Sequence, residues 1–175
     1  SRLEKGRAVT RCHDTKPNGA ITTMRFDSRN WKVMGPAAST AEAEALDAVR
    51  ELLPDDGATT AWVNRTFVHT SERTAEVDVL LLTPVGLFCI ELKGWAGRIV
   101  ANSQRWEQKA KVHPNPFLVT DRKSKLLAAL LKSNATTLEE DKAVPWVRAI
   151  VVLHGEGSAF EVAGASPIGR VLRLD

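Results

Sequence analysis

The stretch "EVDVLLLTPVGLFCIELKGW", residues 76–95, decides the fold that we expect. Two apolar runs flank the turn signal "TPVG" and predict a β-hairpin. The composition suits a buried sheet, yet Asp78 lies in the first arm and Glu91 and Lys93 lie in the second. Charged side chains are rarely buried without partners, so these three residues indicate a site inside the sheet.

The register of this hairpin decides whether the charges meet. Side chains alternate along a strand, so Glu91 and Lys93 project from the same face. If the strands pair across a two-residue turn at 84–85, Asp78 lies opposite Glu91, with Cβ atoms about 4.5 to 5.5 Å apart. A turn with an odd number of residues would place Asp78 opposite Leu92, on the apolar side. The apolar pattern therefore favours the first register.

Two carboxylates at that separation repel each other. Either one of them takes up a proton or a cation lies between them. Oxygen ligands from Asp78 and Glu91 suit a hard cation such as Mg²⁺ or Mn²⁺, and Lys93 could stabilise negative charge developing on a phosphate. The cluster predicts a metal site for phosphodiester chemistry. The alternative is an exposed sheet face on which Glu91 and Lys93 form an ordinary salt bridge.

The first predicted helix, residues 39–53, adds a third carboxylate. Ser39 or Thr40 can cap it. Glu42 falls on the apolar stripe that must face the sheet, so we expect it to join the other two acids. The alternative is that Glu42 only favours the helix dipole from the first turn.

The second predicted helix, residues 120–133, has Thr120 or Asp121 as its cap. Its basic residues are candidates for substrate binding: Lys123, Arg122 and Lys125. Lys123 lies within the apolar stripe, whereas the other two lie behind it. The alternatives are that Lys123 only extends its amine to solvent and that the charge run is a solvated face.

Composition bounds the class of protein. The chain has 175 residues, 43% hydrophobic and 26% charged, which indicates one globular domain. A net charge of +3 permits nucleic acid as a partner without requiring it. Cys12 and Cys89 lie far apart and outside any Cys/His cluster, which excludes a structural zinc site and fits a cytoplasmic location. No apolar run approaches the roughly 18 to 20 residues that span a bilayer, so we expect no membrane partner.

The order of elements predicts the architecture. Beyond the elements above, we expect a strand at 61–70, a second hairpin at 97–112 and a buried strand at 144–155. Helix, strands, helix and strand in this order predict an α/β fold with a mixed sheet. Residues 1–35 read as an arm with strand character only at 21–26, and residues 36–175 as one domain. The chain begins without Met and ends at "VLRLD", so we expect a fragment of a longer chain.

Three runs carry a family resemblance: "AEVDVLLLTPVGLFCIELKGWAGRI" (75–99), "EAEALDAVRELLP" before it and "HPNPFLVTDRKSKLLAALL" after it. Together they resemble the NERD, or nuclease-related, domain over about residues 36–155. The blocks E-x-D, G-L-F-x-I-E-x-K and N-P in this order are specific as a set. The version that they resemble most is the one at the N-terminus of bacterial Ser/Thr kinases of phage-growth-limitation and BREX-type defence systems.

The resemblance implies a restriction-endonuclease-like PD-(D/E)xK fold, with a mixed β-sheet core flanked by helices. It implies a catalytic core of Asp78, Glu91 and Lys93, with Glu42 as the helix carboxylate and the Leu92 carbonyl as a metal ligand. The implied function is a Mg²⁺- or Mn²⁺-dependent nuclease acting on DNA in anti-phage defence, fused to a kinase. Many NERD domains carry a Gln in the helix after the N-P block, where this chain has "DRKSK".

Two alternatives remain open at this point. The first is a catalytically weak or inactive module that binds DNA or a partner defence protein for an attached Ser/Thr kinase. The second is a purely structural interaction domain. A nuclease should depend on a divalent metal and on Lys93, whereas a binding module should not.

Overall fold

The computed structural model describes residues 30–70, 73–135, 144–163 and 169–174. The expected strand at 21–26 lies outside the described residues. Within them, no helix is both long and apolar enough to cross a membrane.

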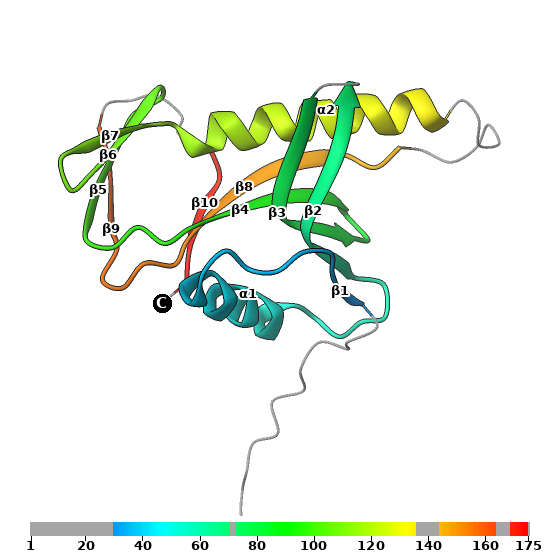
Figure 1. Ribbon diagram of the computed structural model, residues 1–175, viewed down its shortest axis with the longest axis horizontal. Coiled ribbons are helices and arrows are strands. Elements are labelled where there is room, and N and C mark those ends of the chain that lie inside the picture. The colour runs from blue at the N-terminus through cyan, green and yellow to red at the C-terminus, as the bar shows by residue number, and fades with distance from the viewer. Residues whose placement is uncertain (1–29, 71–72, 136–143, 164–168, 175) are drawn as a thin grey trace, which may run out of the picture.

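Ten strands and two helices make up the described chain. In order they are β1 (Trp31–Val33), α1 (Thr40–Leu52), β2 (Thr60–Thr70), β3 (Arg73–Thr83), β4 (Gly86–Lys93), β5 (Arg98–Ala101), β6 (Arg105–Gln108), β7 (Lys111–Pro114), α2 (Pro116–Ala135), β8 (Val147–Leu153), β9 (Ala159–Val162) and β10 (Val171–Arg173). A six-stranded mixed sheet has the order β1-β2-β3-β4-β8-β10, and a four-stranded sheet has the order β7-β6-β5-β9. Figure 1 shows the large sheet between α1 and α2, with the small sheet at one end. The predicted α/β class with a mixed sheet is confirmed, and the architecture is consistent with a restriction-endonuclease-like core.

The central hairpin has the predicted register. Thr83 pairs with Gly86 across the two-residue turn, and the antiparallel ladder continues to Val79 and Ile90. On its other side β4 pairs in parallel with β8, so the hairpin lies in the middle of the sheet.

Alternate residues of β4 face two separate cores. Ile90 and Leu92 pack with the apolar stripe of α1, whereas Leu87 and Cys89 pack with Leu127 of α2. Each fully buried side chain of this kind stabilises the fold by roughly 1.5 to 3 kcal/mol. The sheet is therefore covered on both faces, as the continuous apolar runs predict.

The start of α2 differs from the prediction. The helix begins at Pro116, because Asn115 caps it: Asn115 Oδ1 accepts the Phe117 N–H at 2.9 Å. Proline suits the first helical position, where its missing N–H removes no bond. The prediction of Thr120 or Asp121 as the cap is wrong. Thr120 lies one turn inside the helix, and its hydroxyl donates to the Pro116 carbonyl at 2.9 Å.

Two further differences concern strands. The second predicted hairpin is a three-stranded meander, because Lys109 and Ala110 adopt positive φ values of 50° and 60° and split its second arm into β6 and β7. Such turns usually need Gly or Asn, so the sequence carried no signal for this one. Within the expected arm, Trp31–Val33 pairs in parallel with β2, so this part of the arm belongs to the sheet.

Candidate functional site

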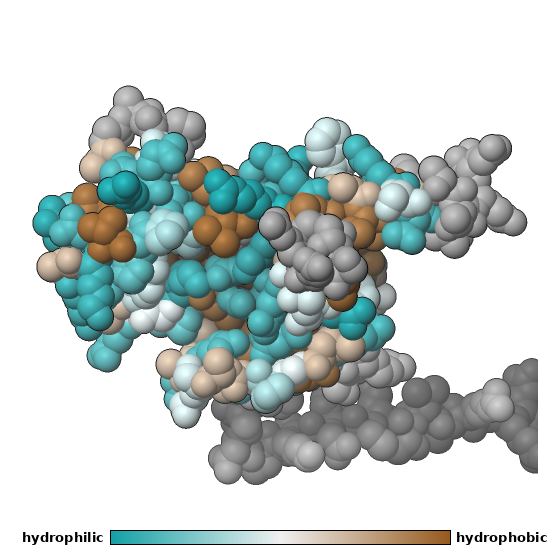
Figure 2. Space-filling view, turned by 45° about the horizontal axis from the view of Figure 1, so that its top comes forward, coloured by the Kyte–Doolittle hydropathy of each residue, from teal (hydrophilic) through white to brown (hydrophobic). Residues whose placement is uncertain are grey.

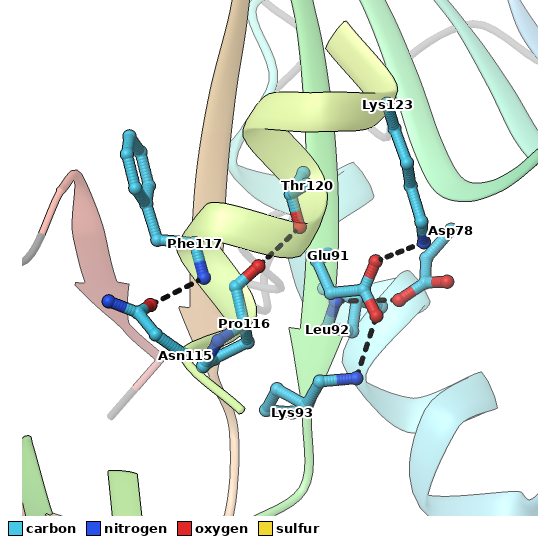
Figure 3. Close-up of polar contacts among 9 residues, drawn as sticks. All are labelled: Asp78, Glu91, Leu92, Lys93, Asn115, Pro116, Phe117, Thr120 and Lys123. Atoms are coloured by element: carbon cyan, nitrogen blue, oxygen red, sulfur yellow. Dashed lines mark hydrogen bonds and ion pairs between the residues drawn. The ribbon is translucent and has the colours of Figure 1, made fainter. Parts of the chain in front are cut away.

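Asp78, Glu91 and Lys93 meet where the central hairpin is farthest from its turn. Lys93 Nζ lies 2.7 Å from Glu91 Oε1, and Asp78 Oδ2 accepts the Leu92 N–H at 2.7 Å. Figure 3 shows the two carboxylates side by side. Asp78 and Glu91 also line one cleft of about 360 Å³.

The position of Asp78 follows from the end of the β3–β4 ladder. The last paired residues are Val79 and Ile90. One step further, the Asp78 carboxylate takes the place of a backbone acceptor and binds the amide of Leu92. This bond satisfies a buried N–H group, which would otherwise destabilise the fold. The site is therefore built into the hydrogen bonding of the sheet.

Burial and charge shift the two carboxylates in opposite directions. Burial, followed by the negative charge of Glu91, raises the pKa of Asp78 to about 6, although the Leu92 N–H opposes the shift. Burial alone would also raise the pKa of Glu91, but hydrogen bonds and charges from Lys123 and Lys93 outweigh it and lower that pKa. At neutral pH Glu91 is thus the better stabilised anion, and Asp78 is the one that a further cation would help most.

Only one of the three basic candidates on α2 enters the site. Lys123 Nζ lies 2.8 Å from Glu91 Oε2, with 20% of its side chain exposed. Lys123 is therefore a direct partner of Glu91, and its amine does not simply extend into solvent. Arg122 is exposed, and Lys125 forms an ion pair with Asp121 at 2.6 Å.

Glu42 lines the cleft but is engaged at the start of α1. Its Oε2 accepts the Ala38 N–H at 2.8 Å, while Ser39 Oγ accepts the Glu42 N–H at 3.2 Å. This arrangement closely resembles a capping box, and it confirms Ser39 as the cap. Glu42 thus stabilises the start of the helix, and it borders the same cleft as Asp78 and Glu91.

Asn64 links β2 to the segment just before α1. On β2, Val63 pairs with Val79 and Arg65 pairs with Val77. Asn64 lies between them and is therefore opposite Asp78. Its φ of 52° is unusual within a strand. The amide Nδ2 donates to the carbonyl of Pro36 at 2.8 Å, just before the cap of α1. Asn64 therefore ties the helix that carries Glu42 to the strand beside Asp78.

His154 belongs to the cleft although its sequence position gave no sign of it. The backbone N–H of His154 donates to the Lys93 carbonyl at 3.1 Å, and His154 lines the cleft together with Lys93. Burial lowers the pKa of His154. A methyl group on Gly94 would lie 3.0 Å from His154 Cε1, so the glycine after Lys93 makes room for the ring. No ligand spacing could have identified this histidine, because β8 brings it to β4 only in the folded sheet.

The donor set fits a hard divalent cation that keeps much of its water. Among the described residues, no group of three or more His, Cys, Asp or Glu side chains is arranged to hold a metal ion, so the expected three-carboxylate cluster is not found there. Two carboxylates with one backbone carbonyl and water are nevertheless the kind of shell that Mg²⁺ accepts. The raised pKa of Asp78 marks a repulsion that a cation would relieve. Asp78, Glu91 and the Leu92 carbonyl could therefore hold such an ion.

Two of the comparisons with known proteins give a match. A family model described as "Nuclease-related domain" (NERD) matches residues 37–154. The chain is 35% identical over 106 residues to a protein of Streptomyces coelicolor (strain ATCC BAA-471 / A3(2) / M145) described as "Probable kinase PglW", and the match covers 58% of this chain and 7% of that protein. The chain thus spans a small part of that relative. No solved structure gives a significant match.

Proposed function

The chain belongs to the NERD, or nuclease-related domain, family, and on this premise we propose that it is a divalent-metal-dependent nuclease domain that cleaves DNA phosphodiesters. The observation that carries the proposal is the pair of neighbouring carboxylates, Asp78 and Glu91, with two lysine amines within 2.8 Å of Glu91. Acids for a metal and cations for a phosphate are the groups that phosphodiester hydrolysis requires.

Each residue has a role in this proposal. Asp78, Glu91 and the Leu92 carbonyl hold Mg²⁺ or Mn²⁺, which supplies Lewis acidity and lowers the pKa of bound water. Lys93, held by Glu91 and 27% exposed, presents its amine to the cleft and stabilises negative charge on the phosphate. Glu42 orients Lys93 or binds a second ion from the opposite wall. Lys123, Arg122 and Lys125 contribute phosphate contacts, with Lys123 nearest to the acids.

A second candidate function is a catalytically weak or inactive module that binds DNA or a defence protein for an attached kinase. The two ion pairs of Glu91 favour it, because both carboxylate oxygens already have a cationic partner. We propose in either case that the longer protein carries a Ser/Thr kinase and acts in bacterial anti-phage defence, since the relative is described as a probable kinase. A cytoplasmic location fits the free, buried thiol of Cys89.

A plasmid-cleavage assay with Mn²⁺ tests the proposal. Wild type should nick the plasmid, and Asp78→Asn, Glu91→Gln and Lys93→Met should each reduce the rate at least about 100-fold, as loss of groups that act together in catalysis does. Glu44→Gln is the matched control, because Glu44 is an exposed acid of α1. Titration calorimetry with Mn²⁺ then tests the site without substrate.

The outcomes separate the two candidates. Cleavage that persists in Glu91→Gln would overturn the proposed nuclease. DNA binding without any metal-dependent cleavage, unchanged in Lys93→Met, would establish the binding module in its place.

A further inference from the structure

The β6–β7 hairpin, Arg105–Pro114, borders the candidate site on a side that the proposed chemistry does not use. A cleft of about 230 Å³ has Glu91 and Lys93 in one wall and His113 and Pro114 in the other. A second cleft, of about 650 Å³, also has His113 and Pro114 in its wall and reaches Arg105. His113 and Pro114 of the hairpin therefore border both clefts.

The ring of His113, which borders both clefts, is packed against other aromatic rings. The Trp95 ring packs on the His113 ring with centroids 4.6 Å apart and a tilt of 33°. The Trp106 ring meets the Trp95 ring edge-on, with the two ring centroids 6.0 Å apart. A methyl group on Gly155 would lie 2.2 Å from the Trp95 carbonyl carbon, so only glycine allows this crossing. The aromatic wall next to Lys93 is therefore preorganised.

The hairpin carries three exposed cations and one exposed acid, Glu107. Arg105, Lys109 and Lys111 are exposed, and within the described ranges none of them forms an ion pair with an acid. Lys111 lies on the same strand face as His113, two residues away, whereas Arg105 and Glu107 lie on the opposite face of the hairpin. By contrast, Arg98 on the neighbouring strand is paired with Glu161 at 2.7 Å. Figure 2 shows mainly hydrophilic side chains over this end of the molecule.

The tip of the hairpin is strained. Lys109 and Ala110 have φ values of 50° and 60°, although neither is Gly or Asn. The left-handed conformation destabilises an ordinary L-residue by roughly 1 to 2 kcal/mol. Persistent strain of this kind is often found where a backbone conformation serves binding. Here it produces a narrow two-residue tip with a lysine on each side of Ala110.

We infer that the β6–β7 hairpin, whose His113 borders the same cleft as Lys93, binds the DNA backbone beside the scissile phosphate through Arg105, Lys111 and the tip. The inference deepens the proposed function and rests on it for the identity of the ligand. The contacts are independent of sequence, because lysine and arginine bound to phosphates carry no base information. The hairpin sets affinity and register, while the acids of the large sheet perform the chemistry.

Fluorescence anisotropy with a short labelled DNA duplex, without divalent metal and over a range of salt, tests this directly. Arg105→Ala/Lys111→Ala should weaken binding at least about 10-fold and reduce the slope of log K against log salt by about 1.8, since each lost phosphate contact removes about 0.9. Arg65→Ala/Lys132→Ala is the matched control, because it removes the same charges from β2 and from the last turn of α2, and Figure 1 shows both parts away from the small sheet. The control should bind like wild type.

Each outcome decides the inference. A wild-type slope in Arg105→Ala/Lys111→Ala overturns it, and so does a loss that occurs in Arg122→Ala/Lys125→Ala instead, which would place the DNA along α2. Weaker binding in the hairpin variant together with no Mn²⁺-dependent cleavage by wild type would refute the proposed nuclease but support the hairpin contact. Normal cleavage by wild type with unaltered binding in the hairpin variant would refute only the contact.

Discussion

The Asp78 carboxylate and the Leu92 amide form a hydrogen bond of 2.7 Å at the point where pairing between β3 and β4 ends. A catalytic candidate is thereby also a backbone partner within the sheet. The same carboxylate lies beside the charge of Glu91, which helps to raise its pKa. Stability and site chemistry are therefore coupled at Asp78, and this coupling can be measured.

The metal-free protein should lose stability as pH rises through the titration of Asp78. Its pKa is about 6 in the folded protein, above the ordinary value of 3.8, so the folded chain holds a proton that the unfolded chain has released. The stabilisation is complete below pH 3.8 and disappears as pH passes about 6, with an amplitude on the order of 2 to 3 kcal/mol. Urea unfolding with EDTA at several pH values should show this fall in wild type relative to Asp78→Asn. Parallel curves for the two proteins would contradict it.

Removing the Lys123 amine should destabilise the metal-free protein and strengthen its response to metal. Lys123→Met leaves one oxygen of the buried Glu91 carboxylate without its partner, which should lower the free energy of unfolding by about 3 kcal/mol. Mn²⁺ should then raise the melting temperature more in the variant than in wild type, because it replaces the lost charge. Lys125→Met, which breaks an exposed pair with Asp121, is the control and should change stability by less than about 1 kcal/mol. Equal Mn²⁺ shifts in all three proteins would rule out competition between Lys123 and the ion.

Gly94→Ala should displace the ring of His154. The added methyl group would lie 3.0 Å from His154 Cε1, which is closer than carbon atoms pack comfortably. We expect a loss of about 1 to 3 kcal/mol of stability, as for other overpacked sites. Gly94→Ala/His154→Ala should recover most of this loss, because the smaller side chain leaves space. Failure of the double variant to recover would place the strain in the backbone instead. Thermal denaturation of the three proteins measures it.

Asn115 should prove more important than an ordinary helix cap. Its Oδ1 caps α2, while its Nδ2 donates to the Ser103 carbonyl at 3.1 Å and its side chain is buried. Asn115→Ala should cost about 2 kcal/mol or more, because the cap and buried hydrogen bonds are lost together. Asn115→Asp keeps the cap acceptor but loses the donor, so its stability should fall between those of wild type and Asn115→Ala. Equal losses in the two variants, measured by urea unfolding, would show that the cap contributes nothing.

Ala110→Gly should stabilise the hairpin tip by about 0.5 to 1 kcal/mol. Glycine removes the left-handed strain at φ 60°, although it also makes the unfolded chain more flexible. Ala48→Gly within α1 is the opposite control, since glycine destabilises a helix interior by roughly 1 kcal/mol. Because Ala110 carries no charge, DNA affinity should not change. A destabilised Ala110→Gly protein would show that the tip conformation is not strained.

The sequence by itself determined the central hairpin, its register and the meeting of Asp78, Glu91 and Lys93. These features follow from the alternation of side chains along a strand and from a two-residue turn, which act over a few neighbouring residues. It also placed Glu42 on the inner side of its helix through the period of 3.6 residues. Local periodicity was sufficient for each of them.

Only the tertiary structure decided which groups complete the site. Lys123 reaches Glu91 from a helix whose start is fixed by Asn115, and Asn115 is held by carbonyls of the turn between β5 and β6. His154 reaches Gly94 because β8 lies beside β4 in parallel. Parallel neighbours are joined by long crossovers, and their register depends on packing across the whole sheet rather than on any local pattern. The partners of the acids were therefore set by how the sheet and α2 pack together, which no short stretch of sequence encodes.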